Sequence, residues 1–173
     1  MRVIGLAGWS GSGKTTLLVR LLPELIRRGI SVSTMKHAHH VFDVDQPGKD
    51  SFRHRAAGAS EVLVASASRW ALMHELRGAS EPSAAELMKH MTQVDLLIVE
   101  GFKREEHDKI EIHRRKNGKP LLYPDDPRIV AVLSDEPLLD CPLPVIDLDD
   151  LVKVADFVIA HCKLLIPVGE AGR

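Results

Sequence analysis

The sequence has few aromatic residues, only two cysteines and no long hydrophobic run. Phe, Trp and Tyr make up 4% of its 173 residues, so Val, Leu, Ile and Ala must fill the interior. Cys141 and Cys162 form no CxxC pattern and no paired framework, which argues against a secreted disulfide scaffold and favours a reducing cytoplasm. No stretch stays apolar over about 18 residues, and the first apolar segment, 1–7, is too short for a signal peptide or a membrane span. We therefore expect neither of them.

An excess of charge of one sign is also lacking. The chain has 23 Lys and Arg against 24 Asp and Glu, a net charge of −1. No field of the whole protein therefore attracts nucleic acid or an anionic membrane, and we expect neither as a partner. The 45% of hydrophobic and 27% of charged residues are typical of a globular protein. The length fits a single domain, which we place at 1–165, with a tail over 166–173.

Short apolar segments alternate with helical patterns along the chain. Segment 2–7 is stopped by glycines, as buried strands often are, and 15–28 then carries leucines at helical spacing. Alternation over 109–113, in the most charged part of the chain, predicts an exposed edge strand, and bare edges tend to be covered. The pattern favours an α/β, three-layer fold with a mainly parallel sheet and an added antiparallel edge hairpin. The remaining expected strands are 30–35, 61–65, 70–76, 95–99, 129–133 and 144–146, and the remaining expected helices are 50–57, 82–91 and 151–165.

The segment GWSGSGKT, from Gly8 to Thr15, matches the phosphate-binding pattern GxxxxGK[ST] at every fixed position. It follows a predicted strand and opens a predicted helix, so we expect a P-loop NTPase fold. Glycines let successive N–H groups turn toward a phosphate, and the helix dipole adds positive potential. Lys14 is expected to contact the β and γ phosphates and to act in catalysis, and Thr15 to offer its hydroxyl to Mg²⁺. The candidate nucleotide-binding residues here are Gly8, Ser10, Gly11, Ser12, Gly13, Lys14, Thr15 and Thr16.

A carboxylate for the metal is expected at the carboxyl end of a neighbouring parallel strand. The run DLLIVEG supplies two acids, Asp95 before the apolar residues and Glu100 after them. Only Glu100 then lies beside the phosphate loop, so it is the candidate metal ligand or water-activating residue. Gly101 is placed to offer its N–H to the γ-phosphate.

The loop after the second predicted strand is rich in polar side chains, and three readings of it stay open. The loop sits where P-loop proteins often place a nucleotide-responsive switch or an acceptor site, and we include Asp45 among the nucleotide-binding candidates. The histidines at 37, 39 and 40 raise the possibility of a metal site, although no cysteine accompanies them. A solvated loop without a ligand is the third reading.

The sequence evidence for a residue that recognises the base is weaker than that for the phosphate loop. The NKxD motif of many GTPases is absent, because Asn117 is the only asparagine and Gly118 follows it. Asp135, just after the predicted strand 129–133, is the best substitute, since one carboxylate can accept from both guanine N1–H and the 2-amino group. An exposed turn residue without a ligand is the alternative.

Three segments together give the sequence a resemblance to the MobB family. They are the phosphate loop, the run KHAHHVFDVDQPGKDS over 36–51 with RHR at 53–55, and VEGFK at 99–103 followed by KIE at 109–111. The resemblance extends to about residue 162. It implies a homodimer, GTP binding with weak Mg²⁺-dependent hydrolysis, and cooperation with the MobA guanylyltransferase that joins GMP to a molybdopterin precursor. It also implies that 42–55 helps to form the functional site. With the implied dimer, the exposed edge predicted at 109–113 leads us to expect that 108–123 lies in a subunit interface.

The expected function is therefore that of a cytoplasmic GTP-binding accessory protein in molybdopterin-guanine dinucleotide biosynthesis, with GTP and Mg²⁺ as its cofactors. A small-molecule kinase with the same phosphate loop stays open, because Arg53, Arg55 and Arg104 are available for a lid. A metal-delivery GTPase is favoured less, since no cysteine-bearing metal loop is present. A scaffold that nucleotide merely stabilises is a third alternative.

Overall fold

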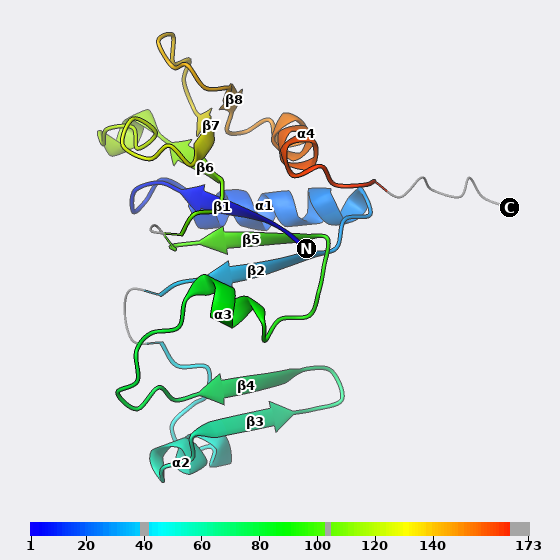
Figure 1. Ribbon diagram of the computed structural model, residues 1–173, viewed down its shortest axis with the longest axis vertical. Coiled ribbons are helices and arrows are strands. Elements are labelled where there is room, and N and C mark those ends of the chain that lie inside the picture. Colours follow the sequence, from blue (N-terminus) through cyan, green and yellow to red (C-terminus); the bar gives the residue numbers. More distant parts are fainter. Residues whose placement is uncertain (39–41, 103–104, 167–173) are drawn as a thin grey trace, which may run out of the picture. The chain divides into compact units, whose positions relative to one another are not determined.

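In the computed structural model, which describes residues 1–38, 42–102 and 105–166, six parallel strands form one sheet (Figure 1). Their order is β2-β5-β1-β6-β7-β8, so the strand that leads into the phosphate loop lies between β5 and β6. The predicted mainly parallel α/β arrangement is confirmed. The strands are β1 (Arg2–Ala7), β2 (Val32–Lys36), β5 (Leu96–Glu100), β6 (Lys109–His113), β7 (Ile129–Ser134) and β8 (Val145–Asp147).

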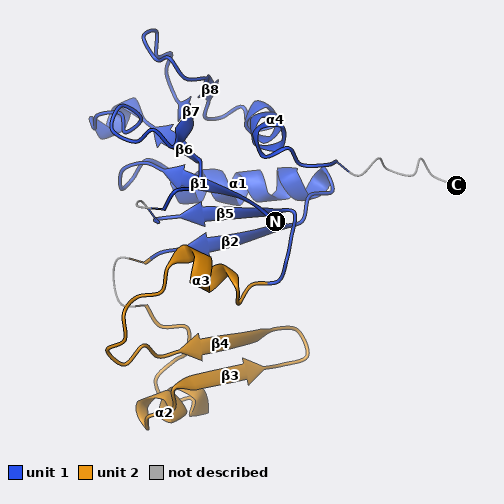
Figure 2. Cartoon of the chain, in the orientation of Figure 1, with its two compact units in different colours: residues 1–37, 92–173 blue, residues 38–91 orange. Residues whose placement is uncertain are grey.

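The chain divides into two compact units (Figure 2). Unit 1 comprises 1–37 and 92–173 and contains the six-stranded sheet, and unit 2 comprises 38–91. The predicted antiparallel hairpin is present in unit 2, where it forms a two-stranded sheet of its own. The single domain over 1–165 stays a prediction. The elements of unit 2 are α2 (Asp50–Ala56), β3 (Glu61–Ala65), β4 (Trp70–His74) and α3 (Ala84–Met88).

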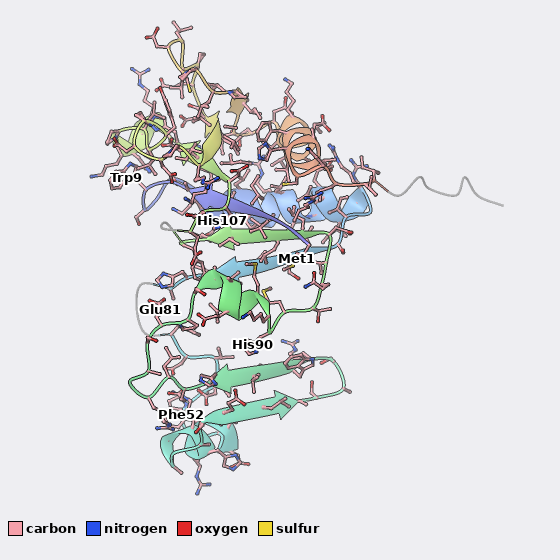
Figure 3. The ribbon with its side chains drawn as sticks, viewed as in Figure 1. Met1, Trp9, Phe52, Glu81, His90 and His107 are labelled. Carbon is pink, nitrogen blue, oxygen red and sulfur yellow. The ribbon has the colours of Figure 1, made fainter. Side chains whose placement is uncertain are left out.

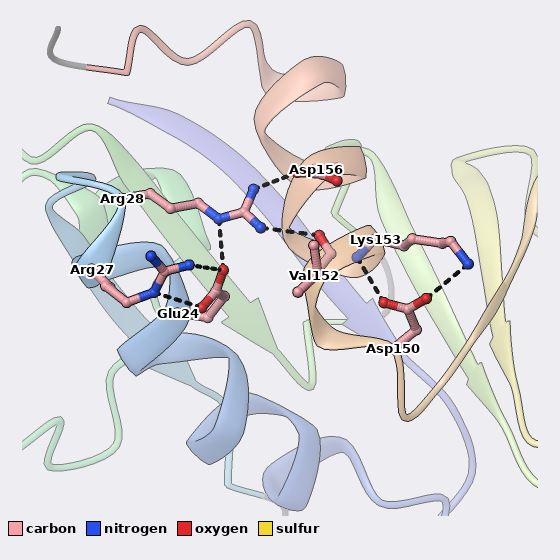
Figure 4. Close-up of polar contacts among 7 residues, drawn as sticks. All are labelled: Glu24, Arg27, Arg28, Asp150, Val152, Lys153 and Asp156. Carbon is pink, nitrogen blue, oxygen red and sulfur yellow. Dashed lines mark hydrogen bonds and ion pairs between the residues drawn. The ribbon is translucent and has the colours of Figure 1, made fainter.

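Two helices, α1 (Lys14–Arg27) and α4 (Leu151–Cys162), pack against each other and share the core of unit 1. Arg28, at the end of α1, joins them: its guanidinium donates to Glu24 of α1 and to Asp156 and the Val152 carbonyl of α4 (Figure 4). Gly29 follows with φ +82, a conformation that favours glycine and ends the helix. The core side chains include Ile4, Leu6, Leu17, Leu21, Leu25, Ile98, Ile110, Ile112, Leu133, Val154 and Val158.

Strand β6 corrects one prediction, because it is a central strand and not an exposed edge. It pairs in parallel with β1 on one side and with β7 on the other. Its two charged side chains are buried and paired: Lys109 Nζ lies 3.1 Å from Asp126, and Glu111 accepts the N–H groups of Leu122 and Tyr123 at 2.8 and 2.9 Å. The alternation therefore separates a core face from a face covered by 120–126. The reason for placing a subunit interface at 108–123 is thereby removed.

Smaller differences concern the ends of elements. Helix α3 is shorter than the predicted 82–91, and it begins with a capping box in which Ser83 and Glu86 satisfy each other's backbone N–H groups. Ser83 is thus the N-cap of α3. Both cysteines are free, with Cys162 buried and Cys141 half-buried. Within the described ranges, no helix is long and apolar enough to cross a membrane.

Candidate functional site

The phosphate loop joins the carboxyl end of β1 to the first turn of α1. Gly8 and Gly13 have φ values of +145 and +95. A Cβ at Gly8 would lie 2.6 Å from Ser12 Oγ and 2.7 Å from the Ile112 carbonyl, so glycine is required there for steric reasons as well. Gly13 caps α1 without a side-chain hydrogen bond, and the first turn of α1 holds no acidic residue. The N–H groups of this turn therefore face a site suited to an anion.

Lys14 folds back over this loop. Its ammonium donates to the carbonyl oxygens of Gly8 at 2.8 Å and of Trp9 at 3.0 Å. Thr15 and Thr16 follow in the first turn of α1 and are exposed. The loop thus holds a positive charge at its centre and two hydroxyl groups at its rim, and the phosphate and metal contacts of these residues stay predictions.

Glu100 ends β5 next to the strand that leads into the phosphate loop. The register pairs Glu100 with Leu6 of β1 on one side and with Lys36 of β2 on the other. Its carboxylate is largely buried, and Oε2 lies 3.9 Å from Lys36 Nζ. Gly101 follows with φ +94, and a Cβ there would lie 2.8 Å from the His37 carbonyl. The predicted placement of Glu100 at the carboxyl edge agrees with this geometry.

Asp95 lies at the opposite end of the same strand, as predicted. Its carboxylate accepts hydrogen bonds from the backbone N–H and the hydroxyl of Ser31. The hydrogen bonds from Ser31, led by that from the hydroxyl, lower the pKa of Asp95. Asp95 therefore fastens the start of β2 to the start of β5, far along the strand from the phosphate loop.

Asp135 follows β7 at the same edge of the sheet as the phosphate loop. One carboxylate oxygen accepts the N–H of Arg115 at 3.0 Å, and the other lies 3.7 Å from Arg114 Nη1. Asp135 also lines a cavity of about 410 Å³ at the carboxyl ends of β7 and β8. Ligands of open parallel sheets bind at this edge. The other lining residues are Ser134, Glu136, Pro137, Leu138, Leu139, Val145 and Asp147.

The segment after β6 contacts the phosphate loop, and the sequence-based reasoning missed it. Arg114 Nε donates to the Ser12 carbonyl at 3.2 Å, and Asn117 Nδ2 lies 3.4 Å from the Ser10 carbonyl. The indole of Trp9, which Figure 3 labels, donates to the Pro120 carbonyl at 2.8 Å. Placing 109–113 beside β1 rather than at an edge would have revealed these neighbours, because the carboxyl ends of adjacent parallel strands meet at one edge.

Asp45 lies in unit 2, where its carboxylate is largely buried and 2.8 Å from Arg55. The same guanidinium pairs with Asp43 at 3.0 Å and with Glu75 at 3.4 Å. Arg55 is therefore already held by three carboxylates, and the role of Asp45 toward nucleotide stays a prediction.

The histidine cluster is only partly described. His37 directly follows β2, and the centroid of its ring lies 5.1 Å from that of Phe102. His39 and His40 lie outside the described residues, as do Lys103, Arg104 and the tail from residue 167. Among the residues that the structure does describe, no group of three His, Cys, Asp or Glu side chains is arranged to hold a metal ion.

The sequence matches known proteins over most of its length. A family model described as molybdopterin guanine dinucleotide synthesis protein B matches residues 3–135. A relative from Escherichia coli strain K12, named a molybdopterin-guanine dinucleotide biosynthesis adapter protein, is 46% identical over 161 residues, which is 91% of each chain. A relative of the same name from Haemophilus influenzae is 42% identical over 159 residues, covering 90% of this chain and 86% of the relative.

Solved structures show the same fold. A crystal structure of molybdopterin-guanine biosynthesis protein B (mobB) superimposes with a TM-score of 0.73 at 25% identity, covering 92% of this chain and 99% of that one. The crystal structure of Bacillus subtilis MobB gives a TM-score of 0.72 at 24% identity, covering 94% and 98%. The phosphate loop, the sheet order and the extent of these matches together place the chain: it belongs to the MobB family.

Proposed function

We propose that this protein binds GTP with Mg²⁺ and serves as an adapter in molybdopterin-guanine dinucleotide biosynthesis, hydrolysing GTP slowly. The observation that carries the proposal is the phosphate loop, in which Lys14 lies across two loop carbonyls and the N-terminus of α1 has no side-chain cap. A helix start of this kind favours an anion, and a lysine at its centre adds a charge-assisted contact.

Different residues around the loop bind the phosphates and the metal ion in this proposal. Lys14 and the N–H groups of 8–16 hold phosphates, Thr15 and Glu100 hold Mg²⁺, and Gly101 offers its N–H to the terminal phosphate. Bound Mg²⁺ neutralises charge that develops on the phosphate oxygens. Lys36 Nζ lies 3.9 Å from Glu100 Oε2 and partly neutralises this carboxylate. Because the Lys36 side chain is exposed, it can move away when Mg²⁺ binds to Glu100.

The adapter role rests on the relatives. The Escherichia coli and Haemophilus influenzae proteins are named as adapters of this biosynthesis, and the MobA guanylyltransferase is the partner that we propose here. GTP binding would set the affinity for MobA and its molybdopterin precursor, in the reducing cytoplasm that two free thiols favour.

We assign the homodimer to the outer face of the β3–β4 hairpin. Leu63 lies opposite Leu72 and Ala65 opposite Trp70, and all four are exposed, whereas Val62 on the other face is buried. An exposed two-stranded sheet with an apolar face is stable only when that face is covered. Sedimentation of Leu63→Lys, with Val19→Lys on α1 as the control, tests this: only the hairpin variant should become monomeric. A wild-type monomer at micromolar concentration would remove the assignment.

Calorimetric titration of GTP and ATP, each with and without Mg²⁺, tests the nucleotide proposal. Wild type should prefer GTP, and Lys14→Ala should weaken GTP binding by about ten- to a hundredfold while the protein stays folded. Lys153→Ala on α4, which loses only an exposed ion pair with Asp150, is the matched control. Equal GTP affinity of the Lys14 variant and wild type would refute the site. Adding MobA should change the GTP affinity, and no change would count against the adapter role.

A further inference from the structure

We propose that Arg114 is a nucleotide-binding residue that contacts the phosphates of GTP and thereby couples phosphate binding to recognition of the base by Asp135. The inference rests on the proposed function, because it concerns the same nucleotide. It adds a second cation to the site and a connection between its two halves.

Three adjacent parallel strands bring the parts together. The order β1-β6-β7 places the phosphate loop, Arg114 and Asp135 directly after neighbouring strands, at one edge of the sheet. The guanidinium of Arg114 bridges the gap: Nε donates to the Ser12 carbonyl at 3.2 Å, and Nη1 lies 3.7 Å from Asp135 Oδ2.

The loop is shaped to receive this side chain. A Cβ at Gly13 would lie 3.1 Å from Arg114 Nε, so the guanidinium lies directly against the backbone that caps α1. The N–H groups of this first turn are the ones that bind phosphate in the proposed site. An arginine here carries its charge at any physiological pH and presents several donors in one plane, which suits phosphate oxygens.

The present contacts leave the guanidinium available. Its hydrogen bond goes to a neutral carbonyl, and its ion pair with Asp135 is long and about one-third exposed on both sides. A second carboxylate, Asp149, is near: the hydrogen bond from Arg20 lowers its pKa, and the charge of Arg114 adds to that lowering. Phosphates bring more negative charge than either partner, so the guanidinium should turn to them when nucleotide binds.

The two halves of the site are then linked through one side chain. While Arg114 pairs with Asp135, it competes with guanine for that carboxylate. Once phosphates attract Arg114, Asp135 keeps the Arg115 N–H and has an oxygen available for the base. Each part of the nucleotide therefore favours binding of the other, which is a coupling through a shared partner.

The test measures affinity for GTP by calorimetry and for guanosine by competition against a fluorescent GTP analogue. Arg114→Ala should weaken GTP binding about ten- to a hundredfold. It should leave guanosine binding unchanged or make it tighter, because Asp135 then lacks a partner that competes with guanine. The control is Arg128→Ala, which removes an arginine paired with Glu106 at the start of β7, the opposite edge of the sheet. It should bind both ligands as wild type does. In addition, the effects of Arg114→Ala and Asp135→Ala on GTP binding should not be additive.

The outcomes separate the inference from the proposed function. Wild type that binds no GTP would remove the proposed function, and the inference with it. Wild type that binds GTP, together with an Arg114→Ala variant of equal affinity, would overturn the inference alone. Equal losses for GTP and guanosine would also overturn it, because Arg114 would then only shape the base pocket. Should the alanine variant fail to fold, Arg114→Lys against Arg128→Lys makes the same comparison, and an unchanged GTP affinity again counts against the role.

Discussion

Lys36 Nζ and Glu100 Oε2 lie 3.9 Å apart at the carboxyl ends of two paired strands, β2 and β5. The pair lies beside β1, whose end leads into the phosphate loop. A buried carboxylate needs a nearby positive charge, and the lysine supplies one when no cation is bound. If Glu100 binds Mg²⁺ as proposed, the cation would compete with Lys36 for its carboxylate.

Glu100→Gln should separate metal-dependent from metal-independent binding. The amide keeps the shape of the side chain and loses the charge that we propose binds Mg²⁺. GTP hydrolysis should fall by about ten- to a hundredfold, while nucleotide binding in the presence of a chelator survives. Glu106→Gln, which changes an exposed acid in the loop before β6, serves as the control. If turnover by the Glu100 variant equals that of wild type, Glu100 only ends the strand.

Asp135→Asn should shift base preference from GTP toward XTP. Guanine presents two donors to a carboxylate, whereas xanthine replaces the 2-amino group with a carbonyl that a carboxylate repels. The asparagine amide keeps one acceptor and gains a donor for that carbonyl, and the unpaired donor on guanine costs about 1 to 3 kcal/mol. Competition titrations of both nucleotides on wild type and variant give the ratio of affinities. An unchanged preference for GTP would place base recognition elsewhere, and Asp135 would then be a solvated turn residue.

Glu111 should make the free energy of unfolding fall as the pH rises, which is opposite to the usual effect of a paired carboxylate. Burial raises its pKa above the ordinary value of 4.5, and the N–H groups of Leu122 and Tyr123 oppose that rise in part. Because the pKa is higher in the folded state, the contribution of Glu111 to the free energy of unfolding is full below pH 4.5 and falls as the pH rises through the folded value.

Glu111→Gln cannot titrate, so the stability advantage of wild type over this variant should shrink with rising pH. Urea unfolding at several values between about pH 4 and pH 7 measures the difference. Glu106→Gln again provides the comparison, since that side chain is exposed. If the difference in free energy of unfolding between wild type and Glu111→Gln stays constant across this pH range, the raised pKa of Glu111 is contradicted.

The two thiols should differ strongly in reactivity. Burial raises the pKa of Cys162 to about 11, whereas Cys141 is half-buried. Since the thiolate is the reactive form, a thiol reagent at about pH 8 should modify Cys141 in the folded protein and Cys162 only after unfolding. Cys141→Ser and Cys162→Ser leave one thiol each, which makes the two rates separable by mass spectrometry. Rapid labelling of Cys162 in the folded chain would contradict its burial.

Local patterns in the sequence predicted the parts of the fold that depend on neighbouring residues. Strand β1, the phosphate loop, helix α1 and the placement of Glu100 were all predicted because glycine chemistry and apolar spacing determine them over short distances. Strand β6 was misjudged for a physical reason. A charged residue usually marks a solvent face, yet Lys109 and Glu111 are buried with partners contributed by residues 17 and 11 positions further along the chain. No local pattern reports such pairing.

Dependence on residues that are distant in the sequence also explains which site residues were missed. Arg114 binds the loop through the Ser12 carbonyl, 102 positions earlier, so its role depends on the strand order and not on its neighbours. Unit 2 was not separated from the rest, because its segment between β2 and β5 carries helix and strand patterns like those elsewhere. The family resemblance, by contrast, was available from the sequence because it depends on residue identity at fixed spacing.

Trp9 places a natural fluorophore inside the phosphate loop. Its indole N–H donates to the Pro120 carbonyl, and its ring centroid lies 5.8 Å from Lys119 Nζ. The polarity of its surroundings and the charge near it therefore depend on the conformation of the loop. The only other tryptophan, Trp70, belongs to unit 2. The tryptophan fluorescence of the chain thus combines one signal from the phosphate loop with one from the hairpin. A Trp70→Phe variant keeps Trp9 as its only tryptophan, so its tryptophan fluorescence reports on the loop without an added label.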